Sequence, residues 1–457
     1  MMSLDEAAQA LGAQLAGADV GFSGVSTDSR SLRSGELFVA LRGERFDGHA
    51  FLDAARQAGA AAALVDRAFA GPSPLPALVV EDTRSALGRL AGHWRARFAP
   101  ALIAITGSNG KTTTKEMLAA ILRQHAGGEQ VLATAGNLNN EIGLPLTLLR
   151  LRAAHRYCAI ELGMNHRGEI AYLADIARPT VALVNNAQRE HLEFLRTVDE
   201  VAAENASVYD GLPPEGVAVV NADDAHAGYF RSRAGAHRVV DFGLEAGAHV
   251  SGGYVLKALS SEIRVRTPQG ECAATLAIPG LHNVRNALAA AACAHAAGIG
   301  PQAIGAGLDA FRPYTGRLQV RRVAGGATLI DDSYNANPDS VRAAIDVLAA
   351  APGRTALVLG DMGEVGESGP ALHAEIGRYA RERGVGALLA LGAAAREAAQ
   401  AYGAGGRHFG SLEELVAAAR EVAAAGGTLL VKGSRFMRME RVVAALGAEP
   451  AAATGAH

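Results

Sequence analysis

The residues with the clearest chemical potential form a short turn, Thr106-Gly107-Ser108-Asn109-Gly110-Lys111-Thr112-Thr113. An apolar run, 101–105, precedes the turn, and a helical pattern with apolar residues on one face follows it. In this setting, successive backbone N–H groups and the positive end of the helix dipole form a socket for phosphate. The pattern G-x-x-x-x-G-K-[ST] is incomplete, because Ile105 stands where its first glycine is required. An ordinary connection between a strand and a helix is the alternative.

Three side chains near this turn are suited to phosphoryl chemistry. Lys111 would reach the β- and γ-phosphates of a nucleotide, and the Thr112 hydroxyl would ligate Mg²⁺. Glu161 ends a predicted buried strand, where a carboxylate is costly unless it is paired or bound to a metal. We therefore interpret Glu161 as a direct or water-mediated Mg²⁺ ligand, and a helix cap or a structural ion pair is the alternative.

A further loop, after the apolar run 181–186, carries His191. The carboxyl ends of parallel strands meet at one edge of a sheet, so this loop, Glu161 and the phosphate turn should converge. A lone loop histidine is usually solvated, and the residue type by itself does not favour a function for His191. We interpret the neighbouring Glu190 and Glu193 as surface charges.

Asparagine side chains offer hydrogen bonds at two other places. The loop 136–143 opens a helix and is suited to binding a substrate. Its asparagines are Asn137, Asn139 and Asn140. The segment 279–286 caps an alanine-rich helix and places Asn283 and Asn286 on one face of its first turn. Asn283 could hydrogen-bond an adenine ring, and helix capping is the alternative.

Strand and helix patterns alternate through the chain, which predicts an α/β protein, and 457 residues suggest three domains. We expect a small N-terminal α/β domain at 1–98, a central P-loop-type parallel-sheet domain at 99–312 and a C-terminal Rossmann-like domain at 313–457. Residues 246–278 predict a small antiparallel patch. The expected buried strands are 37–41, 62–65, 77–80, 101–105, 157–162, 181–186, 328–332, 356–361, 387–391 and 428–433.

Composition excludes several classes of protein. The formal net charge of −3 gives no general attraction to nucleic acid or anionic membranes, so phosphate recognition must be local. The three cysteines are far apart, which favours a reduced cytoplasmic location over a disulfide framework or a zinc site. Acidic residues stand near the N-terminus where a signal peptide would be basic, and no apolar run predicts a membrane span.

Polar loops in the N-terminal and C-terminal parts of the chain are further candidates for ligand binding. The segments 26–30 and 42–49 could bind a ligand, although the residue types alone favour simple turns. In the C-terminal part, the strand 328–332 ends in Asp331 and Asp332, and we expect Asp339 to precede an amphipathic helix. No convincing G-x-G-x-x-G fingerprint is present there, so a dinucleotide site is not expected.

Taken in order, these motifs resemble those of the Mur ligases, the ATP-dependent amide-bond ligases of peptidoglycan synthesis. The resemblance covers nearly the whole chain, and it is greatest to the branch that adds D-alanyl-D-alanine to UDP-N-acetylmuramoyl-tripeptide. The segments that carry it, besides the paired asparagines before His191, are TGSNGKTTTKEML, GNLNNEIGLPLTLL, ELGMNHRGEI, GLHNVRNALAA, DDSYNANPDS and LGDMGEVGE.

The resemblance implies an N-terminal domain that holds the UDP-sugar, a central ATPase domain and a mobile C-terminal domain that closes on both. It implies ATP and Mg²⁺ as cofactors, the two substrates named above, and an acyl-phosphate intermediate on the way to the UDP-muramoyl-pentapeptide. Such an activity belongs to cell-wall biogenesis, and so to cell shape and division. We expect a cytoplasmic monomer.

Roles follow from the resemblance at matching positions. The residues implied to act in catalysis are Lys111, Glu161, His191 and Arg317. Those implied to hold ATP are Gly107 to Thr113, Asn283 at the adenine, Arg317 at the γ-phosphate and Asp331 at the ribose. The implied magnesium ligands are Thr112, Glu161 and His191. The implied substrate residues are Ser26, Thr27, Asp28, Ser29, Arg30 and Arg42 for the UDP-sugar, with Asn137, Asn139, Asn140, Asn335 and Asn337 around the reacting ends.

One position departs from the family pattern. Relatives often carry a lysine, modified to a carbamate, that bridges towards a second Mg²⁺, and Asn205 stands at that position here. Either Asn205 substitutes with the help of water or a second metal is held differently, so we expect no carbamylated residue.

Two other functions remain open on the sequence. One is a sister ligase that adds another amino acid, including the folylpolyglutamate type, and the other is a P-loop nucleotide-sensing module. The sequence also leaves the third peptide residue undecided between diaminopimelate and lysine.

Overall fold

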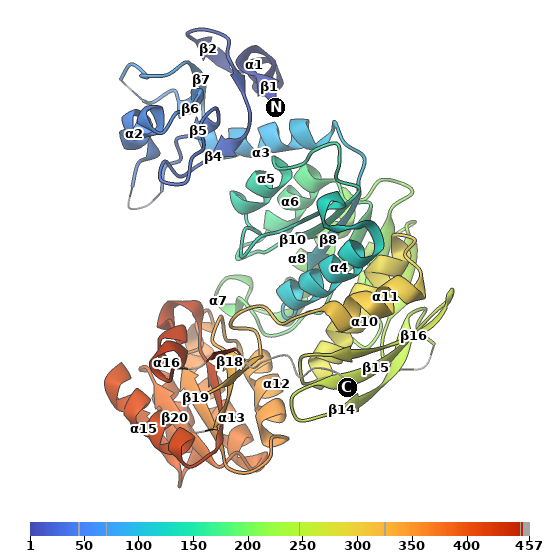
Figure 1. Cartoon of the computed structure of the whole chain (residues 1–457), viewed down its shortest axis with the longest axis vertical. Coiled ribbons are helices and arrows are strands. Elements are labelled where there is room, and N and C mark those ends of the chain that lie inside the picture. Colours follow the sequence, from blue (N-terminus) through green and yellow to red (C-terminus); the bar gives the residue numbers. More distant parts are fainter. Residues whose placement is uncertain (44–45, 70, 246, 324–325, 448, 451–457) are drawn as a thin grey trace.

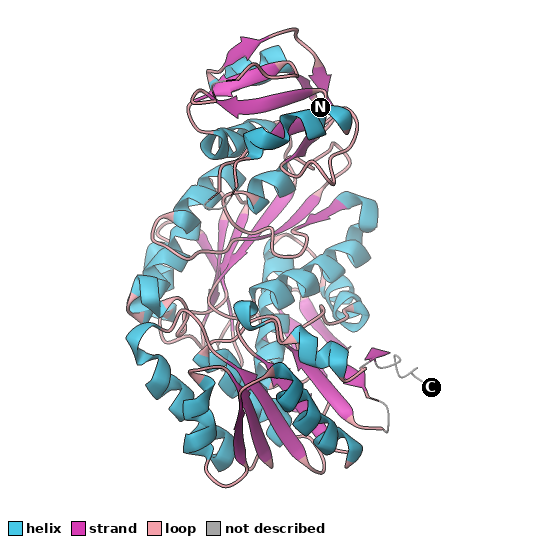
Figure 2. Ribbon diagram, turned by 90° about the vertical axis from the view of Figure 1, so that its left-hand side faces the viewer, coloured by secondary structure: helices cyan, strands magenta, loops and turns pink. Residues whose placement is uncertain are grey.

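Three α/β units, each built on its own sheet, follow one another along the chain in the computed structural model (Figure 1). The structure describes residues 1–450 except 44–45, 70, 246, 324–325 and 448. The N-terminal unit lies at one end of the longest axis and the C-terminal unit at the other, with helices covering the sheets (Figure 2). No helix in this described part is long and apolar enough to cross a membrane.

The N-terminal unit has a five-stranded sheet in the order β2-β7-β6-β5-β4, parallel except for β2. Its strands are β2 (Gln14–Ala16), β4 (Val25–Ser26), β5 (Leu37–Val39), β6 (Ala62–Asp66) and β7 (Ala77–Val80). A separate antiparallel pair joins β1 (Met2–Ser3) to β3 (Gly21–Phe22). The helices are α1 (Leu4–Leu11), η1 (Gly48–Phe51), α2 (Leu52–Gln57) and α3 (Thr83–Arg95). Helix α3 leads into the central unit.

The central unit is a six-stranded, fully parallel sheet in the order β13-β12-β11-β8-β10-β9. Its strands are β8 (Ala101–Thr106), β9 (Val131–Ala133), β10 (Tyr157–Glu161), β11 (Val181–Val184), β12 (Val217–Asn221) and β13 (Arg238–Phe242). Strands β8 and β11 are nearly continuous apolar runs because helices cover both faces of the sheet. The α-helices are α4 (Lys111–Ala126), α5 (Gly143–Leu148), α6 (Glu169–Ala177), α7 (Leu192–Leu195), α8 (Val198–Ala206), α9 (Ala227–Arg233), α10 (Leu281–Ala296) and α11 (Pro301–Ala310). Two short 3₁₀ turns are η2 (Gly128–Gln130) and η3 (Ser207–Gly211).

The predicted antiparallel patch is confirmed as a three-stranded sheet of β14 (Ser251–Leu256), β15 (Ser261–Thr267) and β16 (Gly270–Leu276). Burial alternates along β15, as expected for a strand with one face on a core. That buried face packs on α10 and α11.

The C-terminal unit has seven strands in the order β21-β20-β19-β22-β18-β17-β23. The five from β21 to β18 are parallel, and β17 is antiparallel to β18 and β23. The strands are β17 (Gln319–Arg322), β18 (Thr328–Asp332), β19 (Thr355–Gly360), β20 (Ala387–Leu391), β21 (Gly406–Phe409), β22 (Thr428–Lys432) and β23 (Glu449–Pro450). The helices are α12 (Pro338–Ala349), η4 (Gly366–Ser368), α13 (Gly369–Glu382), α14 (Ala395–Tyr402), α15 (Leu412–Ala424), η5 (Arg435–Met437) and α16 (Glu440–Ala445). The predicted α/β class with a Rossmann-like C-terminal part is confirmed.

Asn283 lies within the first turn of α10, as predicted, and it is not the helix cap, because Gly280 is the N-cap and Leu281 the first helical residue. One predicted helix start is wrong by a few residues. Asp339 does not precede α12 but lies inside it, because Asn337 caps the helix and Pro338 takes the first helical position, where its missing N–H costs nothing.

Candidate active site

The phosphate turn joins the carboxyl end of β8 to the start of α4, and two of its residues must be glycine. Gly110 has a φ of 82°, and an added Cβ would lie 2.2 Å from Oδ1 of Asn286. Gly107 has a φ of 131°, and its Cβ would lie 2.9 Å from the backbone nitrogen of Asn186. The turn can therefore press closely against the next strand and α10, with its N–H groups at the N-terminus of α4.

Two asparagines after β11 fasten the turn. Asn186 binds both backbone groups of Asn109: its Oδ1 accepts from the N–H at 2.8 Å and its Nδ2 donates to the carbonyl at 2.9 Å. Asn185 donates from Nδ2 to the Asn109 carbonyl at 2.7 Å and to Oδ1 of Asn286 at 3.0 Å. These amides hold the turn in one shape before any ligand arrives.

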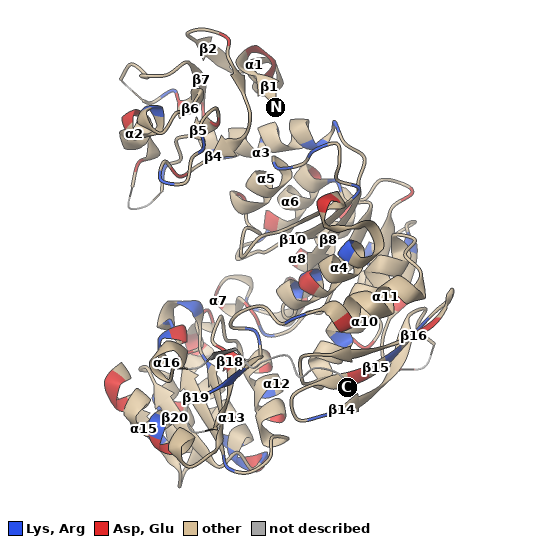
Figure 3. Ribbon diagram, viewed as in Figure 1, with Lys and Arg blue, Asp and Glu red and all other residues tan. Residues whose placement is uncertain are grey.

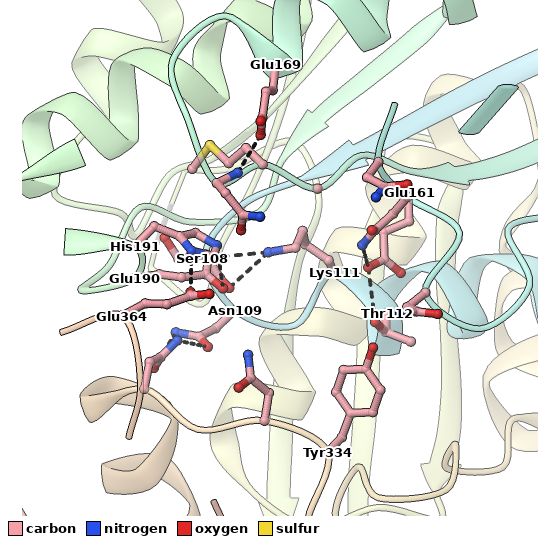
Figure 4. A pocket seen from close by; sticks show the side chains of 18 of the residues that line it. Ser108, Asn109, Lys111, Thr112, Glu161, Glu169, Glu190, His191, Tyr334 and Glu364 are labelled. Atoms are coloured by element: carbon pink, nitrogen blue, oxygen red, sulfur yellow. Dashed lines mark hydrogen bonds and ion pairs between the residues drawn. The ribbon is translucent and has the colours of Figure 1, made fainter. Parts of the chain in front are cut away.

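Lys111 lies over the turn and faces a carboxylate. Its Nζ donates to the carbonyls of Gly107 and Ser108 at 2.5 and 3.2 Å, and it is 3.4 Å from Oε2 of Glu190 (Figure 4). The side chain of Glu190 is only 10% exposed, so the prediction that Glu190 is a surface charge is wrong. Glu193 is exposed, as expected.

Thr112, Glu161 and Asn139 form a second polar group beside the turn. Oε1 of Glu161 accepts from the Thr112 hydroxyl at 3.2 Å and from Nδ2 of Asn139 at 2.8 Å. Oε2 of Glu161 is buried and has no hydrogen-bond partner within the described residues. A hydroxyl beside a carboxylate with a spare oxygen suits Mg²⁺. Among the residues that the structure describes, no group of three or more His, Cys, Asp or Glu side chains could hold a metal. One carboxylate completed by substrate phosphates and water is the arrangement typical of Mg²⁺.

His191 meets a carboxylate from the C-terminal unit. Its Nδ1 is 2.6 Å from Oε2 of Glu364, and its Nε2 is 3.6 Å from Oε1 of Glu190. Hydrogen bonding to His191 lowers the pKa of the Glu364 carboxyl. Both His191 and Glu364 have left-handed backbones, with φ of 54° and 59°. Such strain in non-glycine residues is typical of functional sites.

Arg317 and Tyr334 enter the site from the C-terminal unit. The guanidinium carbon of Arg317 is 4.1 Å from the ring centroid of Tyr334. Its Nε is buried and has no hydrogen-bond partner in the described chain. Tyr334 points towards Thr112 (Figure 4), and burial raises the pKa of its hydroxyl.

These residues line one cavity of about 520 Å³ to which all three units contribute. It brings together most of the predicted site: Ser108 to Thr112, Asn137, Asn139, Asn140, Glu161, His191, Arg317, Asn335 and Asn337. Asn337 also caps α12 and donates from Nδ2 to Oδ1 of Asn109 at 2.9 Å. The C-terminal unit thus contacts the phosphate turn directly.

A second cavity of about 290 Å³ lies on the other side of the turn. Asn283 lines it and donates from Nδ2 to the carbonyl of Pro279 at 2.7 Å. Asp332 and Lys432 face it from the C-terminal unit, with Nζ of Lys432 2.6 Å from Oδ2 of Asp332. Burial lowers the pKa of Lys432, and it lowers the pKa of His282, which also lines the cavity, to about 4.

Asp331 lines neither cavity. Its Oδ1 accepts from the hydroxyl and the N–H of Ser333 at 2.6 and 3.2 Å, and its Oδ2 is 3.2 Å from Nη2 of Arg321. Neighbouring strand residues point to opposite faces, so Asp332 lies at the cavity instead. The position of Asp331 therefore does not support the ribose contact expected for it.

The substrate residues expected in the N-terminal unit also lie outside the main cavity. Asp28 and Arg30 form an exposed ion pair of 2.7 Å on the loop from Ser26. Nε of Arg42 is 2.7 Å from Asp66, and its carbonyl accepts from Nη2 of Arg84, which does line the cavity. Any ligand of this unit must therefore reach past Arg84 to meet the phosphate turn.

Both ends of the Asn205 amide are engaged within the protein. Its Oδ1 accepts from the Thr106 hydroxyl at 2.7 Å, its Nδ2 donates to the Val201 carbonyl at 2.9 Å, and the residue is fully buried. Of the two alternatives for a second metal, substitution by Asn205 is therefore not supported.

Five residues at the two cavities were not predicted from the sequence to have these roles: Glu190, Arg84, Glu364, Asp332 and Lys432. The position of Glu190 could have indicated its role, because Glu190 immediately precedes His191 in a loop expected at the carboxyl edge of the sheet. Glu364 lies in the LGDMGEVGE segment, but nothing in its residue type indicated that it would reach His191 across a domain boundary.

Comparisons with known proteins agree with this geometry. Three family models match: the Mur ligase family catalytic domain over residues 21–95, the Mur ligase middle domain over 105–294 and the Mur ligase glutamate ligase domain over 316–435. The UDP-N-acetylmuramoyl-tripeptide–D-alanyl-D-alanine ligase of Escherichia coli K12 is 42% identical over 449 residues, which are 97% of this chain and 98% of that protein. The ligase of the same name from Haemophilus influenzae is 39% identical, with 97% and 98% covered.

Solved structures have the same architecture. MurF from Acinetobacter baumannii superposes with a TM-score of 0.90 at 36% identity, covering 97% of this chain and 98% of that one. MurF ligase from Thermotoga maritima, solved in complex with ADP, gives a TM-score of 0.80 at 26% identity over 93% and 96% of the two chains.

Proposed function

Because this chain belongs to the Mur ligase family, we propose that it is an ATP-dependent ligase that joins D-alanyl-D-alanine to UDP-N-acetylmuramoyl-tripeptide. The product is the UDP-muramoyl-pentapeptide used in peptidoglycan synthesis. The observation that carries the proposal is that relatives of that name match 97% of this chain. The phosphate turn, which opens into a cavity lined by all three units, is consistent with it.

The chemistry starts with two anions. A carboxylate does not form an amide unaided in water, so the terminal carboxylate of the tripeptide attacks the γ-phosphoryl group of ATP, giving an acyl phosphate and ADP. The amine of D-alanyl-D-alanine then attacks the acyl carbon and expels phosphate. The main duty of the site is therefore to neutralise negative charge, as phosphoryl transfer demands.

The cationic groups of the site fit this role. Lys111 and the N-terminus of α4 bind the phosphates, and Arg317 turns from the Tyr334 ring to the γ-phosphate. The nucleophile is already ionised, so the first step needs no strong base, and His191 supports metal or phosphate instead. Closure of the C-terminal unit excludes water from the acyl phosphate.

Mg²⁺ fits the donors beside the turn. Thr112 and Glu161 would hold it, aided by His191, and the unpartnered Oε2 of Glu161 supports this role. When bound, the ion neutralises charge that develops on the phosphates. Glu161→Gln should weaken Mg²⁺-dependent binding of a non-hydrolysable ATP analogue, measured by calorimetry with and without Mg²⁺. If Mg²⁺ aided binding equally in both proteins, Glu161 would not be a ligand.

The remaining assignments form part of the same proposal. Residues 1–98 bind the UDP-sugar through Ser26 to Arg30 and Arg42, residues 99–312 bind ATP, and residues 313–457 close on ATP and the amine. In the second cavity, Asn283 contacts the adenine, and Asp332 replaces Asp331 as the candidate for the ribose because it lines that cavity. Asn335 and Asn337 line the D-alanyl-D-alanine end. The enzyme acts as a cytoplasmic monomer.

Phosphate release, measured with UDP-muramoyl-tripeptides ending in diaminopimelate or lysine and with several candidate amines, tests the function. We expect release only when ATP, a tripeptide and D-alanyl-D-alanine are all present, and the preferred tripeptide identifies the third residue. Dependence on a different amine would indicate a sister ligase. Release that needs neither substrate would indicate a nucleotide-sensing ATPase.

A further inference from the structure

Arg189 joins the central unit to the C-terminal unit through two carboxylates. Its Nη2 donates to Oδ1 of Asp339 on α12 at 2.7 Å, and its backbone N–H donates to Oδ2 at 2.9 Å. Nη1 donates to Oε2 of Glu375 on α13 at 2.9 Å, and Nη2 to Oε1 at 3.1 Å. Both edges of the guanidinium are therefore occupied, and these hydrogen bonds raise its pKa.

The three side chains are only partly exposed, at 27% for Arg189, 23% for Asp339 and 30% for Glu375. Salt screens such a group less than an open surface pair, and the planar fork gives it one geometry. Because the fork already binds two carboxylates of this chain, Arg189 has no free edge for the carboxylate of a substrate.

The residues on either side of Arg189 contact the phosphate turn. Gln188 accepts from Nδ2 of Asn109 at 2.6 Å and its backbone N–H donates to the Ser108 hydroxyl at 2.9 Å. Glu190 is 3.4 Å from Nζ of Lys111. The contacts that hold Arg189 in place therefore also hold the groups that surround Lys111.

We propose that Arg189 is a positioning residue, which clamps α12 and α13 of the C-terminal unit to the loop 186–191 and so sets Glu190 against Lys111 and His191 against Glu364 only when the two units are docked. The phosphate site then takes its final shape only when the C-terminal unit docks. The inference deepens the proposed function and rests on it for the kinetic readout, whereas the solution-scattering readout is independent of activity.

The test compares the full-length wild type with Arg189→Ala, Arg189→Lys, Asp339→Asn and the double variant Arg189→Ala/Asp339→Asn. Arg383→Ala is the matched control, because Arg383 makes an ion pair of similar length, 2.8 Å to Asp346, wholly inside the C-terminal unit. Each protein is assayed for kcat and for the KM of ATP in ligation. Small-angle X-ray scattering then gives the radius of gyration, and thermal unfolding confirms the fold.

We expect Arg189→Ala to lower kcat at least about tenfold, as for an ordinary coupling between sites, and to change the KM of ATP less than about threefold. Asp339→Asn should lower kcat in the same direction, and the double variant should be no slower than Arg189→Ala, since both changes break the same ion pair between the two side chains. The kcat of Arg189→Lys should lie between those of the wild type and Arg189→Ala, because an ammonium group cannot bind both carboxylates as a fork. Arg189→Ala should also enlarge the radius of gyration, and Arg383→Ala should leave every quantity unchanged.

Several results would overturn the clamp. These are an Arg189→Ala enzyme within about twofold of the wild type, additive losses in the double variant, or an unchanged radius of gyration. A loss of ATP affinity as large as the loss of kcat would mean that Arg189 binds the nucleotide itself. A wild-type protein that shows no ligation would instead contradict the proposed function, and the scattering comparison would still decide whether Arg189 holds the units together.

Discussion

At the scale of single residues, the site is a row of four polar side chains that crosses a domain boundary. Lys111 faces Glu190, Glu190 faces His191, and His191 faces Glu364 from the C-terminal unit. Phosphates entering beside Lys111 would compete with Glu190 for the same ammonium group. Binding of ATP and the position of Glu190 are therefore coupled.

Replacing Lys111 by alanine should lower kcat/KM by about 10²–10³-fold, the usual cost of removing one preorganised donor to developing charge. The melting temperature should stay close to that of the wild type, because Lys111 packs in no core cluster. Phosphate-release kinetics and thermal unfolding measure the two effects. Lys257→Ala is the control, since Lys257 forms an exposed ion pair with Glu262 far from the turn; near-normal activity of Lys111→Ala would contradict its role.

Half-buried His282 should make stability depend on pH. Its pKa is about 4 in the folded protein against an ordinary 6.5, so below pH 6.5 the unfolded chain binds a proton that the folded chain does not. Its contribution is complete above pH 6.5 and is lost as the pH falls towards 4, by on the order of 2 kcal/mol.

Urea unfolding at a series of pH values between 7 and about 4 measures this dependence. In His282→Gln, the free energy of unfolding should fall less steeply with decreasing pH than in the wild type. Parallel curves for the two proteins would show that His282 titrates normally.

At the scale of elements, the site lies where several ends meet. The carboxyl ends of β8, β10 and β11 supply the phosphate turn, Glu161 and the paired asparagines, and the N-termini of α4 and α12 point at the same place. Parallel strands bring their carboxyl ends to one edge, so residues far apart in the chain become neighbours. The turn depends on the close approach of α10 through Asn286.

Gly110→Ala tests that approach. An alanine there combines a left-handed φ with a Cβ 2.2 Å from Oδ1 of Asn286, so the turn must move and ATP affinity should fall at least about tenfold. Gly168→Ala is the matched control, because Gly168 has a similar φ of 87° at the start of α6 but nothing within 4 Å of its Cβ. Calorimetric titration with an ATP analogue compares the two, and equal affinities would show that the contact with Asn286 is unimportant.

At the scale of the whole molecule, recognition is local. The formal net charge is −3, and Lys and Arg are interspersed with Asp and Glu over all three units (Figure 3). The protein as a whole therefore has no strong electrostatic field that would attract an anionic substrate, and the groups in the cavity between the units must attract it. The N-terminal loop with Asp28 and Arg30 lies outside that cavity, so a ligand that uses both must be long, as a UDP-sugar peptide is.

Hydrogen–deuterium exchange should separate the two binding regions. Mg-ATP alone should slow exchange in the phosphate turn and at the start of α10, because it orders those N–H groups. UDP-muramoyl-tripeptide alone should slow exchange in 26–30 and around Arg42. The β14–β15 hairpin is the internal control and should not respond, and protection by the UDP-sugar confined to the central unit would refute the role given to the N-terminal loops.

The sequence by itself determined the parts of this protein that depend on local patterns. Apolar runs and helical periods indicated the sheets of the three units, and the Gly-Lys-Thr turn between strand and helix indicated the phosphate site, because each is encoded within about twenty residues. The motifs in their order also indicated the family.

Only the tertiary structure decided which polar residues face one another. Glu190 looked like a surface charge and is largely covered beside Lys111, while Asp331 and Asp332 are adjacent in sequence and point to opposite faces of a strand. Nothing local indicated which residues Arg189 and Glu364 would contact, because their partners lie more than a hundred residues away and meet them only when the central and C-terminal units dock. Contacts between units depend on the relative position of whole sheets, and no periodicity within one segment records that position.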